Sequence, residues 1–112
     1  MKISSLFEQG KTVFSFEIFP PKKTSSIDTI YSTLEGLSDL KPAFISVTYG
    51  AAGTTATAEK TIEVARQIEC DNKSTALAHL TCASSDEDKI KQVVMQLKEN
   101  NIENILALRG DI

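Results

Sequence analysis

The sequence of 112 residues has no tryptophan, one histidine and only two cysteines, and these scarcities limit what it can encode. Cys70 and Cys82 are too few for a disulfide scaffold, and without an export signal we expect both to be reduced, packed thiols. No second histidine or cysteine pair accompanies the single histidine, so we expect no metal site. No linker or low-complexity run divides the chain, and we therefore expect one domain.

The sequence also lacks a dominant charge and a long apolar run. The formal net charge is −3 and the lysines are scattered, which gives no general attraction to nucleic acid or to anionic membranes. No apolar segment approaches the roughly 20 residues of a membrane span, and the start of the chain lacks the apolar region of a signal peptide. We expect a cytoplasmic protein without a nucleic-acid or membrane partner.

What the chain does contain is an alternation of strand and helix patterns. Apolar residues make up 41% of it and charged residues 24%, which are globular values. Short apolar runs predict strands at 13–19, 43–49, 75–81 and 104–108. Between them, helical spacing predicts three helices, the first within 24–42, the second over 56–69 and the third from Ser84 to the segment NNIEN. We expect these helices to bury Ile27, Ile30, Tyr31, Leu34, Leu37, Ala58, Ile62, Ala65, Ile68, Ile90, Val93, Val94 and Leu97.

Helix starts are marked by two resemblances to a capping box, Ser25 with Asp28 and Ser84 with Glu87. Three strand-helix units followed by a strand predict a parallel α/β sheet with right-handed crossovers. Two architectures fit, a doubly wound open sheet and part of a (β/α)8 barrel. A complete barrel takes about 250 residues, so in the second case the chain would hold half of it and end on the fourth strand.

Polar residues recur near the carboxyl ends of the expected strands. Glu17, Thr48, His79 and Asp111 follow one another at intervals of 31, 31 and 32 residues, which predicts that they stand at one height on successive strands. Residues two apart share a face, so Ser46 lies on the face of Thr48. The carboxyl rim of a parallel sheet is where such proteins bind ligands.

A structural interpretation of the same residues stays open. A lone glutamate at a strand end is more often solvated or ion-paired than catalytic, and a single histidine in such a strand is about as often a core residue as a functional one. The common spacing of the four residues favours a site. It would explain why Glu17 is tolerated in the otherwise apolar run FSFEIF, where a carboxylate loses hydration.

Four motifs in order along essentially the whole chain resemble the methylenetetrahydrofolate reductase family. They are FEIFPPK after a short N-terminal helix, SVTYGAAG on the second strand, AHLTC on the third and ALRGD on the fourth. The resemblance implies a (β/α)8 barrel that carries FAD, with residues 1–112 as its N-terminal half. It also implies the reduction of 5,10-methylenetetrahydrofolate to 5-methyltetrahydrofolate, with electrons passing from NAD(P)H through FAD.

The resemblance further implies roles for two carboxylates. Glu17 would be the general acid that protonates a folate nitrogen and opens the five-membered ring to an iminium. This role needs a carboxyl group that keeps its proton near neutral pH, and we expect Phe14, Phe16 and Phe19 to desolvate it. Asp111 would lie beside the flavin and the pterin, where its charge lowers the reduction potential of the flavin.

The other matched positions would contact the flavin or the nicotinamide, without a metal: Thr48, Tyr49, Ala51, His79, Arg109 and Gly110. The segment TTATAEKT after GAAG departs from the family, whose members often carry more charge there, so no contact is implied for it. Strands five to eight, which supply much of the FAD, folate and nicotinamide sites, would lie outside these residues.

Three functions stay open on the sequence. The first is the homo-oligomeric reductase of one-carbon and methionine metabolism. The second is a non-catalytic half-barrel whose uncovered edges make it self-associate. The third is another barrel enzyme, such as an aldolase or lyase. A Schiff-base enzyme of that kind needs a strand-borne lysine, and the expected strands contain none, which argues against the third.

Overall fold

A computed structural model describes residues 1–8, 10–20, 27–49, 55–83 and 85–110, of which 27 and 55–57 are described by their backbone only. The main elements in these ranges are β1 (Phe16–Ile18), α1 (Ile27–Ser38), β2 (Ile45–Val47), α2 (Thr55–Arg66), β3 (Ala76–Thr81), α3 (Glu87–Glu99) and β4 (Ile105–Leu108). A short 3-10 helix, η1 (Ile3–Leu6), precedes them, and a π-helical turn, η2 (Gln67–Asp71), extends α2.

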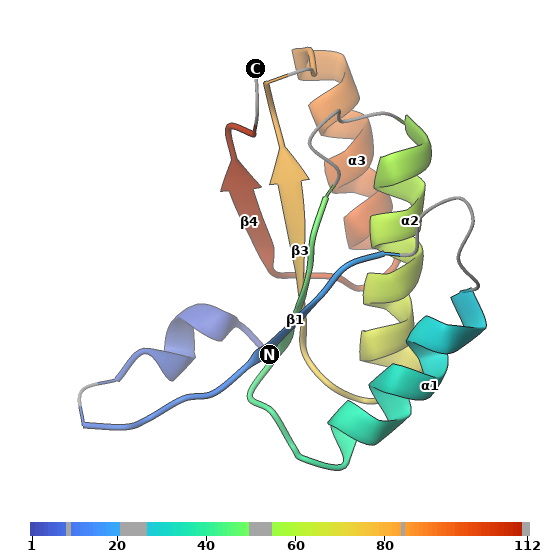
Figure 1. Cartoon of the computed structure of the whole chain (residues 1–112). Helices are drawn as coiled ribbons and strands as arrows, with labels where there is room; N and C mark the ends of the chain where they lie inside the picture. Colours follow the sequence, from blue (N-terminus) through green and yellow to red (C-terminus); the bar gives the residue numbers. More distant parts are fainter. Residues whose placement is uncertain (9, 21–26, 50–54, 84, 111–112) are drawn as a thin grey trace.

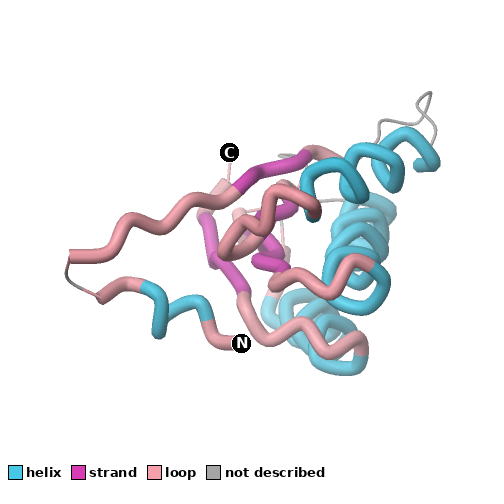
Figure 2. Tube along the Cα trace, turned by 90° about the horizontal axis from the view of Figure 1, so that it is seen from below, coloured by secondary structure: helices cyan, strands magenta, loops and turns pink. Residues whose placement is uncertain are grey.

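The four strands form one parallel sheet in the order β1-β2-β3-β4, so each strand pairs with its neighbours in the chain. Helices α1, α2 and α3 lie on one side of this sheet, and the N-terminal segment lies on the other (Figure 1, Figure 2). A doubly wound sheet reverses its strand order and carries helices on both faces. The observed order confirms the α/β class and the barrel-type half-sheet, and it excludes the doubly wound sheet for the described strands.

The hydrophobic core lies between the sheet and the helices. Alternation along the strands turns Ile45, Val47, Ala76 and Ala78 toward the helices, and all four are fully buried. The helical residues that pack in the same cluster include Leu34, Ala58, Ile62, Ala65, Ile68, Val93 and Leu97, as their spacing predicted. Each larger side chain gains about 1.5–3 kcal/mol by leaving water, which holds the helices on this face.

Helix α3 begins differently from the prediction. Its N-cap is Asp86, whose Oδ1 accepts a hydrogen bond from the backbone N of Lys89 over 2.8 Å. Glu87 is therefore the first helical residue, and the expected capping box of Ser84 with Glu87 is wrong. Aspartate is as good an N-cap residue as serine, and Asp86 directly precedes the first helical residue. The other expected capping residue, Ser25, lies outside the described residues.

One residue of the predicted core of α3 is exposed. Val93 and Leu97 are buried and Ile90 is partly buried against them, but 39% of Val94 is accessible. Val94 follows Val93 by one position, which is a rotation of about 100° around the helix axis. It therefore lies outside the buried stripe.

Strand β1 is shorter and more exposed than the apolar run FSFEIF suggested. Backbone hydrogen bonds to the β2 side begin at Phe14, whose carbonyl accepts from the N of Ala43 over 3.0 Å, but regular pairing covers three residues. Phe14 and Phe19 are 53% and 69% exposed. The Glu17 side chain is itself half-exposed, so the expectation that these aromatic side chains desolvate it is wrong. The physical reason is that β1 has a neighbour in the described sheet on one side only.

The cysteines also differ in part from expectation. Both are free thiols, as predicted, and Cys82 is partly buried, but Cys70 is exposed rather than packed. Cys70 lies in η2, where the chain leaves α2, so its side chain does not reach the core. Among the described helices, none is both long and apolar enough to cross a membrane.

The N-terminal segment is tied to the amino end of β4 by one asparagine. Oδ1 of Asn104 accepts a hydrogen bond from the backbone N of Ile3, and its Nδ2 donates to the carbonyl of Met1, both over 2.8 Å. The N-terminal ammonium lies 2.7 Å from Glu103, and this hydrogen bond raises the pKa of the ammonium and lowers that of the carboxyl. That ion pair is exposed and adds little, whereas Asn104 is buried.

We predict that Asn104→Ala lowers the free energy of unfolding by about 1–3 kcal/mol, because the buried N–H of Ile3 loses its partner. Urea denaturation measures the change. Asn100→Ala is the control, since the Asn100 side chain donates only an exposed hydrogen bond to the carbonyl of Gln96. Equal stability of the Asn104 variant and the wild type would show that the tie is not formed.

Candidate functional site

Three polar side chains from three neighbouring strands meet on the face that the described helices leave open. The hydroxyl of Ser46 donates a hydrogen bond to Oε1 of Glu17 over 3.1 Å, and Nε2 of His79 lies 3.3 Å from the same oxygen. Ser46 is 6% exposed, and the side chains of His79 and Glu17 are 12% and 52% exposed. A carboxylate on β1 is thus held from β2 and β3 and still opens to solvent.

Glu17 and His79 meet although they do not stand at one height. Glu17 pairs with Ser46, and Ser46 pairs with Leu77, which is two residues before His79. The prediction of equal height is therefore wrong for Glu17, which stands two residues below Thr48 and His79. For Thr48 and His79 it agrees with the register, because Val47 pairs with Ala78 and the next residues along the two strands are Thr48 and His79. Paired residues lie 29 apart between β1 and β2, 31 between β2 and β3, and 27 between β3 and β4. Barrel-type sheets stagger their strands, so equal spacing in the chain does not give equal height.

Sequence reasoning placed Ser46 on the correct face but did not include it in the site. A signal was present in the composition of its strand. Ile45, Ser46 and Val47 are all buried, and a hydroxyl buried between two apolar residues needs a hydrogen-bond partner. A polar neighbour across the sheet, in this case Glu17, is the natural partner.

Thr48 lies just past β2 on the same face as Ser46, by strand alternation. Its backbone N donates to the carbonyl of Ile18 over 3.1 Å, which continues the pairing with β1. Its carbonyl accepts a hydrogen bond from Oγ1 of Thr61 over 2.9 Å. Thr61 is buried in α2, so this helix anchors the carboxyl end of β2.

The end of β4 comes close to the end of β3. The carbonyl of Arg109 accepts a hydrogen bond from the N of Ala83 over 2.7 Å, and the side chain of Arg109 is exposed. Gly110 has a φ of +81°, and a Cβ at this position would lie 2.9 Å from the Cβ of Thr81. Asp111 and Ala51 lie outside the described residues, so their roles stay predictions.

Tyr49 lies on the other face of the sheet. Its side chain belongs to the core cluster and is 8% exposed, and its hydroxyl has no hydrogen-bond partner among the described residues. Burial raises the pKa of this phenol. The ring packs with the helical layer and not beside Glu17, and the cofactor contact predicted for Tyr49 stays a prediction.

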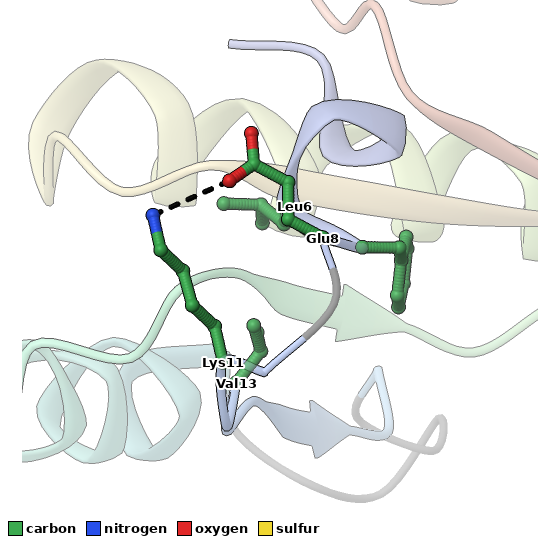
Figure 3. A pocket seen from close by; sticks show the side chains of 5 residues that line it. Leu6, Glu8, Lys11 and Val13 are labelled. Atoms are coloured by element: carbon green, nitrogen blue, oxygen red, sulfur yellow. Dashed lines mark ion pairs between the residues drawn. The ribbon is translucent and has the colours of Figure 1, made fainter.

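The hollows formed by the N-terminal segment lie apart from this site. One is lined by Leu6, Phe7, Glu8, Lys11 and Val13. Figure 3 shows Lys11 reaching toward Glu8, whose carboxylate is 3.3 Å from its Nζ. A second, of about 600 Å³, lies between the N-terminal segment and the amino ends of β3 and β4. Neither is lined by Glu17, Ser46 or His79.

Comparison with known proteins identifies the family. The family model described as methylenetetrahydrofolate reductase matches residues 2–112, and the chain therefore belongs to the methylenetetrahydrofolate reductase family. Three relatives bear this out. "Methylenetetrahydrofolate reductase (NADH) 1" of Arabidopsis thaliana is 38% identical over 110 residues, which is 98% of this chain and 18% of that protein. "Methylenetetrahydrofolate reductase 2" of Schizosaccharomyces pombe is 42% identical over 115 residues, or 99% of this chain and 18% of the relative.

The third relative is bacterial and shorter. "5,10-methylenetetrahydrofolate reductase" of Escherichia coli is 36% identical over 104 residues, which is 93% of this chain and 34% of that protein. The chain thus spans between about a fifth and a third of the length of these relatives.

The residues at the open face suit the flavin that the family resemblance implies. A flavin nucleotide needs hydrogen-bonding groups and a backbone that its ring can approach closely. Thr48 and His79 offer such groups, and Arg109 adds an exposed guanidinium. The Cβ position of Gly110 faces Thr81, so the structure explains this glycine by packing within the chain. Thr48, His79 and Arg109 fit the group and would help to hold it, and the flavin contact of Gly110 stays a prediction.

We predict that Gly110→Ala destabilises the protein by about 1–3 kcal/mol, because alanine is strained at positive φ and its Cβ would meet Thr81. Gly36→Ala is the matched control. Gly36 lies within α1 with nothing near its Cβ position, so that change should stabilise by about 0.5–1 kcal/mol. Thermal unfolding of both variants measures the difference, and a shift of the same sign in both would contradict the account.

Proposed function

We propose that this chain is the N-terminal half of the catalytic barrel of an enzyme that reduces 5,10-methylenetetrahydrofolate to 5-methyltetrahydrofolate with NAD(P)H and FAD, in one-carbon metabolism. One observation carries the proposal. In a chain of this family, Glu17 projects from β1 onto the open face of the sheet and is held there by Ser46 next to His79. No other described carboxylate is placed beside both of them.

Glu17 is the residue to which we assign the general acid. Its carboxyl group would give a proton to a nitrogen of the methylene bridge, which opens the five-membered ring and leaves an electrophilic iminium. The structure shows a half-exposed Glu17 side chain whose Oε1 lies 3.3 Å from Nε2 of His79, a contact that does not by itself require an acid role. Family membership and the match of the FEIFPP motif therefore support the acid role, and the contacts support the position.

The other matched residues would bind rather than transfer protons. FAD, when bound, would supply the hydride that reduces the opened folate. Thr48, His79, Arg109 and Gly110 would hold it at the carboxyl ends of the strands, and we retain Tyr49, Ala51 and Asp111 as proposed members of the site. The four strands that the structure describes carry no lysine, which continues to argue against a Schiff-base aldolase.

We predict that Glu17→Gln in the full-length protein slows folate reduction by about 10²-fold or more, which is the usual contribution of a general acid. Oxidation of NAD(P)H with a quinone or other artificial acceptor should continue at a similar rate, because that half-reaction needs no proton from Glu17. Stopped-flow absorbance of the flavin separates the two steps. Glu35→Gln is the control, because it removes an exposed carboxylate of α1. Equal loss of both half-reactions would refute the assignment.

A second candidate concerns the 112-residue polypeptide by itself. All four residues of β4 are exposed, and its large side chains Ile105, Leu106 and Leu108 are 37%, 40% and 37% accessible. β4 also has a neighbour on only one side in the described sheet. Unpaired, apolar strand edges associate with other chains, so we propose that this polypeptide is non-catalytic and self-associates through β4.

We predict that light scattering of the purified 112-residue polypeptide gives at least twice the monomer mass of 12.2 kDa. Leu106→Lys should shift it toward the monomer, because a charge on an edge strand blocks pairing. Leu40→Lys is the control, since Leu40 is 60% exposed but follows α1 rather than lying in β4. A monodisperse wild-type monomer, or equal masses for the two variants, would exclude this candidate.

A further inference from the structure

Ser46 occupies a position where a polar side chain needs an explanation. It lies in the middle of β2, between two apolar residues that are fully buried, and it is itself 6% exposed. A buried hydroxyl without a partner costs about 1–3 kcal/mol. Its one described hydrogen bond goes across the sheet to Oε1 of Glu17. The register places Ser46 directly opposite Glu17, so this bond follows from strand pairing.

The two oxygens of the Glu17 carboxyl group have different surroundings. Oε1 accepts the Ser46 hydrogen bond and also lies 3.3 Å from Nε2 of His79. Oε2 has no hydrogen-bond or ion-pair partner among the described residues, and the side chain is 52% exposed. A proton placed on Oε1 would compete with the hydroxyl proton of Ser46. A proton on Oε2 meets no such competition.

We propose that Ser46 is a positioning residue. Its hydroxyl occupies Oε1 of Glu17 as a hydrogen-bond donor, so that Oε2 is the oxygen that carries and delivers the proton. This inference rests on the proposed function of Glu17 as general acid. In the step, the Oε2–H bond breaks and a bond forms between the proton and the bridge nitrogen. The carbon–nitrogen bond then breaks toward that nitrogen, and the lone pair of the second nitrogen forms the iminium. Glu17 is left as a carboxylate whose Oε1 is still bonded to Ser46.

The hydrogen bond also limits where the acid can move. A glutamate side chain on an exposed edge strand populates several rotamers, and it must adopt the productive one before it can transfer its proton. A donor fixed in a buried central strand holds one of them in advance. Loss of the hydroxyl should therefore slow the step that uses the Glu17 proton and leave the other step alone.

The test uses Ser46→Ala in the full-length protein, with the two half-reactions measured separately by stopped flow. We expect oxidation of the reduced flavin by 5,10-methylenetetrahydrofolate to slow by about tenfold, the loss of one hydrogen bond to a reacting group. Reduction of the flavin by NAD(P)H should keep its rate. Ser46→Thr, which retains a hydroxyl, should restore the folate step. Ser38→Ala, which removes a buried hydroxyl far from Glu17 at the end of α1, should change neither step.

An unchanged folate step in Ser46→Ala, or an equal fall in both steps, would overturn the inference. The second result would mean that Ser46 only stabilises the sheet. Should Ser46→Ala fail to fold, Ser46→Cys keeps the volume but donates weakly, and the same comparison applies to it.

A spectroscopic measurement separates this inference from the proposed function. The ¹³C resonance of the Glu17 carboxyl carbon, assigned by its loss in Glu17→Gln, should move in Ser46→Ala and stay in place in Ser38→Ala. If Ser46→Ala moves the resonance but the wild-type protein reduces no folate, the Ser46–Glu17 contact is supported and the proposed function is refuted. A resonance that does not move would refute the positioning role by itself.

Discussion

The hydrogen-bonded register between β1 and β2 determines where the Glu17 side chain stands, and the rest of the site depends on it. Phe16, Glu17 and Ile18 pair with Ile45, Ser46 and Val47. A shift of one residue would turn Glu17 toward the helices and Phe16 toward the open face. The apolar side chains that pack under the helices hold the register, since the same shift would expose Ile18 and bury a carboxylate.

Different contacts fix the chain at the two ends of the sheet. At the amino end, Asn104 ties the N-terminal segment to β4 through backbone groups, which is a purely structural contact. At the carboxyl end, Thr61 anchors the chain after β2, and Gly110 lets the chain after β4 approach Thr81. The polar residues Glu17 and His79 meet on the open face between these anchors. Structural contacts thus fix the chain at both ends of the sheet, and the polar side chains stand on the face between them.

Much of the fold could be predicted from periodicity, and the errors have physical reasons. The strand-helix alternation and the buried helix stripes followed from apolar spacing, because the core selects for it. The cap of α3 was misplaced because Ser84 and Asp86 are both good caps, and only the backbone path decides between them. The exposure of Phe14 and Phe19 could not be predicted, since an edge strand and a central strand have similar composition.

The candidate site was predicted in part for a related reason. The shared face of Glu17 and His79 followed from alternation, but their relative height depends on the stagger of the strands, which chain spacing does not contain. The most direct measurement is a crystal structure of the full-length protein. The account predicts that the Glu17 carboxylate lies on the inner face of the barrel, hydrogen-bonded to Ser46 and in contact with His79. A Glu17 side chain turned away from both residues, with the Ser46 hydroxyl bonded elsewhere, would contradict it.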